Sequence, residues 1–201
     1  MSLLDLSPVV PVVVVDDVAR AVPLAEALVR GGVRIIEVTL RTDAALESIR
    51  RIVDEVPDAV VGAGTVTTPV LAAAALAAGA KFLVTPGTTE SVLAAAADTG
   101  LPILPGAATV SEAMRLAELG YTELKFFPAE AAGGVPFLKS IAGPLPALRF
   151  CPTGGITATT APTYLSLPNV ACVGGSWLTP TTANPTTIER LAREATALRS
   201  S

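Results

Sequence analysis

The sequence contains no histidine, and this absence excludes several catalytic designs. A Ser-His-Asp triad, a Cys-His pair and a histidine-ligated metal site all require that side chain. Any proton transfer must then use a carboxylate, a tyrosine, a lysine or water. Cysteine is also scarce: Cys151 and Cys172 are the only two, and their spacing fits neither a metal motif nor a disulfide framework. We expect both to be reduced core residues.

Charged residues are also few, and this limits the classes of partner that the protein can bind. Only 16% of the 201 residues are charged, the net charge is −4, and the basic residues are scattered. A nucleic-acid partner requires a clustered basic surface, so we expect none. No apolar run is long enough to span a bilayer, and no basic segment followed by an apolar region indicates a secretory signal. The sequence therefore predicts a cytoplasmic protein without a membrane partner.

What the chain does contain is valine, alanine and a regular alternation of two patterns. Hydrophobic residues make up 51% of the sequence, in short valine- or leucine-rich runs separated by stretches with helical spacing. The spacing predicts a single (β/α)8 barrel domain over residues 1–201, with a doubly wound open sheet as the alternative. The apolar excess also favours a subunit interface. The expected strands are Val9–Val15, Val33–Val38, Val60–Ala63, Lys81–Val84, Pro102–Leu104, Glu123–Phe126, Arg149–Cys151 and Val170–Val173.

Lys125 is the most informative single residue. The chain has three lysines, and only this one lies in an apolar, aromatic segment, Glu123–Phe127. A desolvated lysine loses part of its preference for the charged form, and the free amine can attack a carbonyl to form a Schiff base. The alternative is a lysine whose stem packs along the strand while its ammonium group reaches solvent.

Glu37 and Arg41 are the second informative pair. Residues two apart in a strand share a face, so both side chains follow the same side of the second expected strand. In a barrel, Glu37 and Lys125 would both point into its mouth, with Arg41 near enough to bind a substrate carboxylate. A buried structural ion pair is the alternative.

Two glycine pairs follow the last two expected strands. Thr153-Gly154-Gly155-Ile156 comes after the seventh, and Gly174-Gly175-Ser176-Trp177 comes after the eighth. Barrels often bind phosphate with the backbone of these two loops, and glycine allows close approach to the anion. Two tight βα turns without a ligand are the alternative.

With these residues assembled, the chain closely resembles the 2-keto-3-deoxy-6-phosphogluconate (KDPG) aldolases, which also act as 4-hydroxy-2-oxoglutarate (KHG) aldolases. The resemblance runs from about Pro8 to Leu198. Its most specific segments are EVTLRT (37–42), ELKFFPAE (123–130) and RFCPTGGI (149–156), and it continues in GGVRII (31–36), VGAGTV (61–66), TPG (85–87), AAGGV (131–135), IAGP (141–144) and GGSWL (174–178).

The resemblance implies a class I aldolase of the Entner-Doudoroff pathway that cleaves KDPG to pyruvate and glyceraldehyde 3-phosphate. Lys125 would form the Schiff base and Glu37 would be the general acid and base. The substrate would be a phosphorylated 2-keto acid, and neither a cofactor nor a metal would be needed. The implied substrate contacts are Arg41 and Thr65 at the carboxylate, Pro86 and Phe127 along the pocket, and Thr153, Gly154, Gly155, Gly174, Gly175 and Ser176 at the phosphate end.

The resemblance also implies a homotrimer, and Thr153 resembles the pattern of enzymes specific for the gluconate epimer. Two departures from the family pattern lie away from the site: an N-terminal helix of some relatives is expected to be missing or short, and Pro162 is expected to start its helix late.

Two other functions stay open at this point. One is a phosphate-binding barrel of another class, such as an isomerase, and the other is a trimeric barrel that serves as an assembly scaffold.

Overall fold

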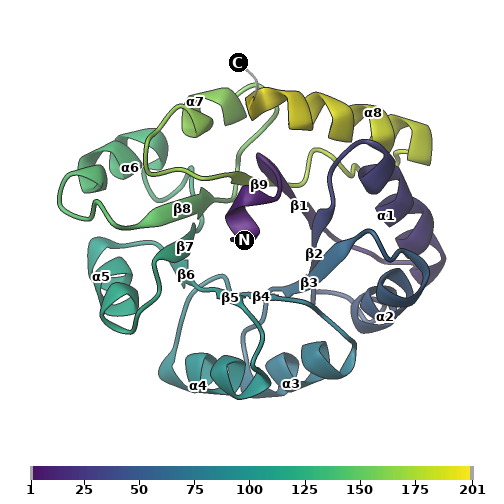
Figure 1. Ribbon diagram of the computed structural model, residues 1–201, viewed down its shortest axis with the longest axis horizontal. Helices are drawn as coiled ribbons and strands as arrows, with labels where there is room; N and C mark the ends of the chain where they lie inside the picture. Colours follow the sequence, from purple (N-terminus) through teal and green to yellow (C-terminus); the bar gives the residue numbers. More distant parts are fainter. Residues whose placement is uncertain (1, 200–201) are drawn as a thin grey trace.

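Parallel strands alternate with helices in the computed structural model of the protein, which describes residues 2–199 (Figure 1). The strands are β1 (Val9–Val13), β2 (Ile35–Thr39), β3 (Val60–Gly64), β4 (Leu83–Val84), β5 (Ile103–Leu104), β6 (Gly106–Ala107), β7 (Glu123–Phe126), β8 (Arg149–Pro152) and β9 (Val173–Gly175). The α-helices are α1 (Ala21–Arg30), α2 (Ala45–Glu55), α3 (Pro69–Ala77), α4 (Glu90–Thr99), α5 (Val110–Glu118), α6 (Gly134–Ala142), α7 (Ala161–Leu165) and α8 (Pro185–Thr196).

The strands form a curled parallel sheet with the helices on its outer side (Figure 1). Six strands pair in the order β5-β4-β3-β2-β1-β9, and three pair in the order β6-β7-β8. Isolated bridges from Phe150 to Val170 and from Thr153 to Gly174 connect β8 with the segment of β9. A doubly wound sheet would carry helices on both faces, so this arrangement does not match the alternative.

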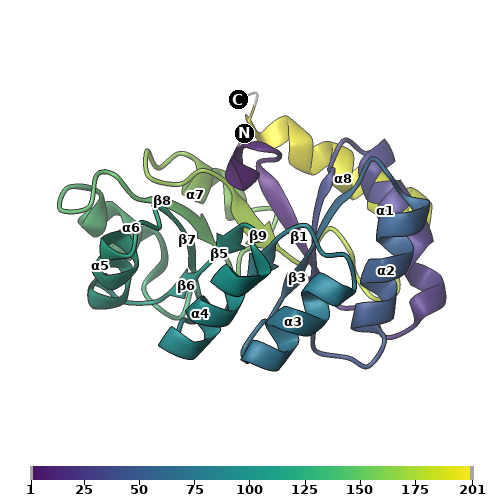
Figure 2. The same ribbon diagram turned by 60° about the horizontal axis from the view of Figure 1, so that its bottom comes forward.

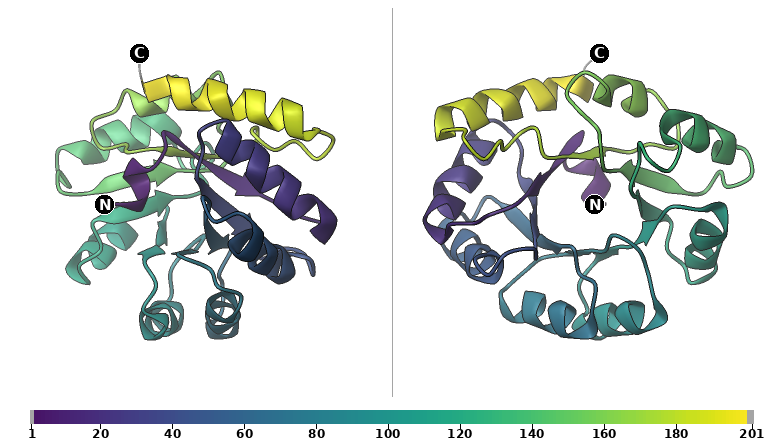
Figure 3. Two further views of the ribbon diagram at one scale, coloured as in Figure 1. Left: turned by 45° about the vertical axis from the view of Figure 1, so that its right-hand side comes forward. Right: turned by 180° about the vertical axis from the view of Figure 1, so that it is seen from behind.

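Alternate strand residues face two separate apolar clusters. Val9 and Ile36 belong to the large cluster between sheet and helices, whereas Val10 and Ile35 belong to a smaller one. The smaller cluster also contains Leu4, which lies in a short 3-10 helix. Figure 1 and the right-hand view of Figure 3 show this N-terminal segment inside the curve of the sheet. The period-two alternation thus fills both the inside and the outside of the sheet.

The 3-10 helix Leu3–Asp5 covers the end of the sheet where the strands begin. Leu4 is 1% exposed, and Arg149 donates hydrogen bonds to Asp5 at 2.5 Å and to Glu123 at 2.8 Å. The prediction of a short N-terminal helical segment is confirmed. One buried leucine and an ion-pair network close this end of the sheet.

The predicted strand Glu123–Phe126 is confirmed residue for residue, but the last one is displaced. We expected Val170–Val173, whereas β9 is Val173–Gly175. Val170 forms only an isolated bridge with Phe150, its N–H donates to Leu167 O at 3.1 Å, and the regular strand begins at Val173. Valine content alone therefore placed the start of the strand too early.

The fifth strand position differs in another way. We expected one strand over Pro102–Leu104, whereas β5 covers Ile103–Leu104 and pairing resumes in β6 after Pro105. Proline has no N–H to offer the ladder, which explains the break. Thr85 Oγ1 accepts the Gly106 N–H at 3.0 Å, and Thr88 Oγ1 donates to Gly106 O at 2.8 Å, so two threonine side chains replace the missing ladder bonds.

Helix ends follow the expected chemistry. α7 begins at Ala161 with Pro162 in its first turn, which confirms the late start. α5 begins with a capping box: Thr109 Oγ1 accepts the Glu112 N–H, and the Glu112 carboxylate accepts the Thr109 N–H at 3.0 Å. Among the described residues, no helix combines the length and apolar character that crossing a bilayer requires.

The capping box predicts a pH-dependent contribution to stability. The backbone N–H of Ala108, which donates to Glu112 at 2.8 Å, lowers the pKa of the Glu112 carboxyl group in the folded protein. Ionised Glu112 therefore stabilises the fold above its unfolded pKa, and this stabilisation is lost as the pH falls through the lower folded value. We expect Glu112→Ala to reduce the free energy of unfolding by about 0.5–1 kcal/mol at pH 7, with a smaller difference at pH 3.5. Urea denaturation at both pH values measures it, and a difference that grows toward low pH would contradict the assignment.

Candidate active site

A buried lysine and a buried glutamate from distant parts of the chain meet inside the curled sheet. Lys125 on β7 is 4% exposed and Glu37 on β2 is 2% exposed. The Lys125 Nζ donates a hydrogen bond to Glu37 Oε1 at 3.0 Å. The Phe127 ring lies on the same amine, with 5.5 Å between Nζ and the ring centroid. The sequence predicted that these two side chains converge, and the structure brings them into direct contact.

The neighbours of Lys125 in β7 explain its inward direction. Leu124 and Phe126 are 0% and 1% exposed and belong to the large cluster under the helices. Phe126 stacks on Phe137 of α6, with 4.8 Å between ring centroids and an interplanar angle of 2°. Since alternate strand residues point to opposite faces, these outward anchors turn Lys125 toward the inside of the sheet.

The space for the Glu37 carboxylate comes from a glycine. Gly64 ends β3, beside the strand that carries Glu37. A Cβ at residue 64 would lie 2.1 Å from Glu37 Oε1, the oxygen that accepts the Lys125 hydrogen bond. No larger residue fits there without moving the carboxylate, so Gly64 permits the contact between Glu37 and Lys125.

Arg41 and Thr65 meet just beyond the ends of β2 and β3. Arg41 is exposed, and its Nε donates to Thr65 Oγ1 at 3.0 Å. Thr65 has φ of +59°, and it is the only non-glycine residue with positive φ in the described part of the chain. This conformation is costly for a β-branched residue, and such strain concentrates at functional sites. The sequence predicted the pair but not its strained backbone.

An open cavity of about 230 Å³ leads from the surface to the Lys125 amine. Arg41 and Phe127 line it together with the two glycine loops that the sequence singled out. Three further lining residues were missed: Val12, Val14 and Ile156. Val12 pairs with Glu37 in the sheet register, so the alternation of β1 could have identified it. The predicted residues in the wall are Arg41, Lys125, Phe127, Thr153, Gly154, Gly155, Gly174, Gly175 and Ser176.

The first glycine loop has a backbone that only glycine adopts freely. Gly154 and Gly155 have φ of +106° and +80°. The second loop lies directly beside the first, because Thr153 and Gly174 form an isolated bridge. The two loops therefore make one continuous wall of backbone in the cavity.

Three predicted residues lie outside this wall. Glu37 lies beneath the Lys125 amine, and Thr65 reaches the site through Arg41. Pro86 packs its carbonyl group against the backbone of Gly106, where a Cβ would lie 2.4 Å from the Pro86 oxygen. Pro86 is thus adjacent to the strand paired with Lys125, since Gly106 is the register partner of Lys125.

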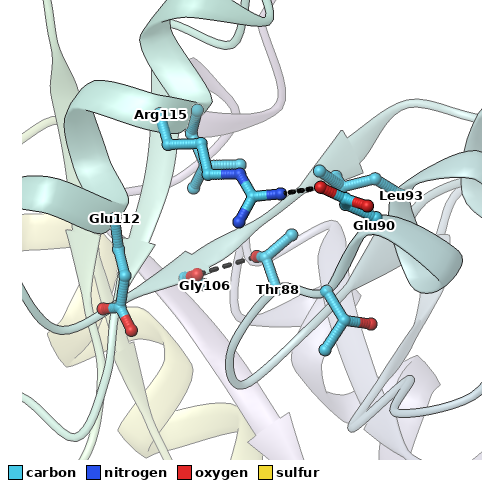
Figure 4. A pocket seen from close by; sticks show the side chains of 8 residues that line it. Thr88, Glu90, Leu93, Gly106, Glu112 and Arg115 are labelled. Carbon is cyan, nitrogen blue, oxygen red and sulfur yellow. Dashed lines mark hydrogen bonds and ion pairs between the residues drawn. The ribbon is translucent and has the colours of Figure 1, made fainter.

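A second hollow, between α4 and α5, does not compete with this cavity. Figure 4 shows Glu90 paired with Arg115 across it, above Thr88 and Gly106. Its volume of about 40 Å³ has room for a water molecule or two, not for an organic substrate. The cavity of about 230 Å³ is the candidate active site because the buried amine lies at its base.

Comparisons with known proteins agree on one family. The sequence model of the KDPG and KHG aldolases matches residues 1–191. A 2-dehydro-3-deoxy-phosphogluconate aldolase of Dickeya dadantii is 54% identical over 200 residues, which cover 98% of this chain and 94% of the relative. The KHG/KDPG aldolase of Escherichia coli K12 is 52% identical over 198 residues, covering 96% and 93%.

A solved structure shares the fold and gives a view of the chemistry in a relative. The KDPG aldolase of Legionella pneumophila, with pyruvate captured at low pH as a covalent carbinolamine intermediate, superposes with a TM-score of 0.93. It is 46% identical, and the match covers 96% of each chain. With a family model spanning most of the chain and relatives above half identity, this protein belongs to the KDPG and KHG aldolase family.

Proposed function

We propose that this protein is a class I aldolase that cleaves 2-dehydro-3-deoxy-6-phosphogluconate to pyruvate and glyceraldehyde 3-phosphate. We propose that it also cleaves 4-hydroxy-2-oxoglutarate to pyruvate and glyoxylate. The observation that carries the proposal is the buried contact of 3.0 Å between Lys125 Nζ and Glu37 Oε1 at the base of an open cavity. The carbinolamine captured in the Legionella relative supports an amine nucleophile.

In the proposed reaction the Lys125 amine attacks the C2 ketone. Glu37 Oε1, within hydrogen-bond distance of Nζ, first accepts a proton from the Lys125 ammonium group and so frees the amine for attack. In the adduct one nitrogen proton moves to the former ketone oxygen, and protonated Glu37 then gives its proton to the same hydroxyl group, which leaves as water as the iminium forms. The iminium then draws the electron pair of the C3–C4 bond as the C4 hydroxyl gives its proton to the Glu37 carboxylate and the aldehyde departs. Protonation of the enamine at C3 and hydrolysis of the iminium release pyruvate and free Lys125. The iminium is the electron sink, so we propose no metal or cofactor.

The two ends of the cavity suit the two ends of the substrate. Arg41, held by Thr65, would bind the carboxylate next to the ketone, since guanidinium groups match carboxylates geometrically. The loops of Gly154, Gly155, Gly174, Gly175 and Ser176 would bind the phosphate through backbone N–H groups. Thr153 lies in the same wall and favours the gluconate epimer, while Pro86 would support the pocket from behind.

We further propose that residues 1–201 form one domain with a closed (β/α)8 barrel. The succession of β5 and β6 around Pro105 would join the two sheets on one side. The bridges Phe150–Val170 and Thr153–Gly174 would join them on the other. In such a barrel Lys125 and Glu37 meet at the mouth, where barrel enzymes place their sites.

A homotrimer is also proposed, and α3 supports it. This helix is apolar all round, yet Ala72 and Ala75 are its buried residues, and Val70 and Leu76 are 76% and 44% exposed. A helix without a polar face is normally covered. Figure 2 shows α3 on the outside of the molecule beside α4, where a second copy could cover it.

The scaffold and isomerase alternatives are not favoured, because relatives at 52% and 54% identity are named aldolases.

Replacing the nucleophile tests the proposed chemistry. We expect Lys125→Met to lower the rate of KDPG cleavage by at least about 1000-fold, because methionine cannot form the iminium. Lys81→Met, which makes the same change at an exposed lysine, should leave the rate within twofold of the original protein. Coupled detection of pyruvate measures both. Cleavage by Lys125→Met at a rate near that of the original protein would contradict the proposal.

Gly64 tests the role of Glu37 indirectly. We expect Gly64→Ala to displace the carboxylate from Lys125 and to reduce kcat by about a hundredfold, the scale of a lost general acid–base group. Gly143→Ala is the matched control, because φ there is −68° and no atom lies within 4 Å of the added Cβ. If Gly64 acts through Glu37, the double variant Gly64→Ala, Glu37→Gln should be no slower than Glu37→Gln alone. If the fold-losses in kcat of the two single variants multiply in the double variant, Gly64 does not act through Glu37.

The oligomer proposal predicts that a charge on α3 separates the subunits. Val70→Asp should shift the mass measured by light scattering from three chains toward one. Thr186→Asp introduces the same charge at an exposed residue of α8, across the molecule from α3 (Figure 1), and should leave the mass unchanged. A trimer that persists in Val70→Asp would exclude α3 from the interface.

A further inference from the structure

A buried tyrosine holds the segment that follows the lysine strand. Tyr164 on α7 is 2% exposed, and its hydroxyl donates a hydrogen bond to Glu130 Oε1 at 2.7 Å. Glu130 lies five residues after Lys125, in the connection from β7 to α6. The bond therefore ties the helix that follows the first glycine loop to the loop that follows Lys125.

Glu130 in turn forms the back of the first glycine loop. Its N–H donates to Gly154 O at 3.1 Å, and the N–H of Ala129 donates to Thr153 O at 2.8 Å. A Cβ at Gly155 would lie 2.6 Å from Glu130 Cγ, so the loop backbone rests directly on the side chain of Glu130. Any shift of Glu130 is thus transmitted to Gly154 and Gly155.

The Tyr164 hydroxyl is enclosed on its other side by α6. A Cβ at Gly134, the first residue of that helix, would lie 2.9 Å from the Tyr164 oxygen. Burial raises the pKa of Tyr164, and the hydrogen bond to Glu130 adds to this effect, so the hydroxyl keeps its proton at neutral pH. Tyr164 is therefore a permanent donor to the Glu130 carboxylate.

The phosphate end of the cavity depends on backbone geometry. Among the described residues that line the cavity, Arg41 and Lys125 are the cations, and both have roles at the keto-acid end. Neither Tyr164 nor Glu130 is one of those lining residues. Without a cation of its own, the phosphate end must rely on N–H groups held in fixed positions.

We propose that Tyr164 and Glu130 are positioning residues for the first glycine loop, and that their hydrogen bond sets the preference for a phosphorylated over an unphosphorylated 2-keto acid. The inference rests on the proposed function and deepens it. Loss of the bond loosens Gly154 and Gly155 at the phosphate end, while Lys125, Glu37 and Arg41 keep their geometry. A substrate without phosphate does not need the loop and is indifferent to the change.

Tyr164→Phe removes the hydroxyl and keeps the ring, so it tests the proposal directly. We expect KM for KDPG to rise about tenfold, the scale of a lost hydrogen bond to a charged group, with kcat within twofold. With 2-dehydro-3-deoxygluconate, the same 2-keto acid without its phosphate, both parameters should stay within twofold. Glu130→Ala should repeat this pattern, and Glu130→Gln, which keeps an acceptor oxygen, should restore most of the affinity for KDPG.

The only other tyrosine provides the matched control. Tyr121 lies before β7, at the opposite end of that strand from Phe127, and Tyr121→Phe should leave KM for both substrates unchanged. Glu130 is exposed, so Glu130→Ala keeps the test valid if Tyr164→Phe fails to fold. Equal losses with both substrates, or no change with either, would overturn the positioning role alone. If the original protein cleaved neither substrate, the proposed function itself would fall.

Discussion

The contact between Lys125 and Glu37 is the constraint on which the rest of the site depends. Both side chains are nearly fully buried, and two unlike charges removed from water must be paired to be tolerated. Removal of one partner from such a pair typically costs about 3–5 kcal/mol, so the contact is not one that a stable fold acquires by accident. The proposed reaction gives a reason for this buried pair, because the carboxylate that pairs with the Lys125 ammonium group would accept its proton when the substrate carbonyl binds.

The surroundings of the pair are arranged to keep both groups in place. Phe126 anchors the lysine strand outward against α6, and Gly64 leaves the volume that the Glu37 carboxylate occupies. Arg41 and the two glycine loops, the proposed substrate-binding parts, follow the ends of the strands and line the same cavity. In the proposed reaction, rigid strands would hold the reacting atoms and loops would bind the rest of the substrate, an arrangement that favours precise positioning.

Most strand positions and the direction of Lys125 could be predicted from the sequence, because strand periodicity and residue chemistry indicate the same arrangement. The segment around Lys125 was predicted in full, since its alternation places two apolar residues outward and the lysine inward. The start of β9 and the break at Pro105 were missed, because they depend on which carbonyl or hydroxyl takes a particular N–H. The strained backbone of Thr65 and the buried contact of Tyr164 were also invisible, since both arise from packing between segments distant in sequence.

Borohydride reduction in the presence of pyruvate, followed by peptide mass spectrometry, tests the central claim most directly. Borohydride converts an iminium to a stable secondary amine, so the site of attachment is fixed before digestion. The account predicts a pyruvate-derived adduct on Lys125 that is absent without pyruvate and absent from Lys81 and Lys139. Folded protein without any adduct, or an adduct on another lysine, would contradict the assignment of Lys125 as the nucleophile.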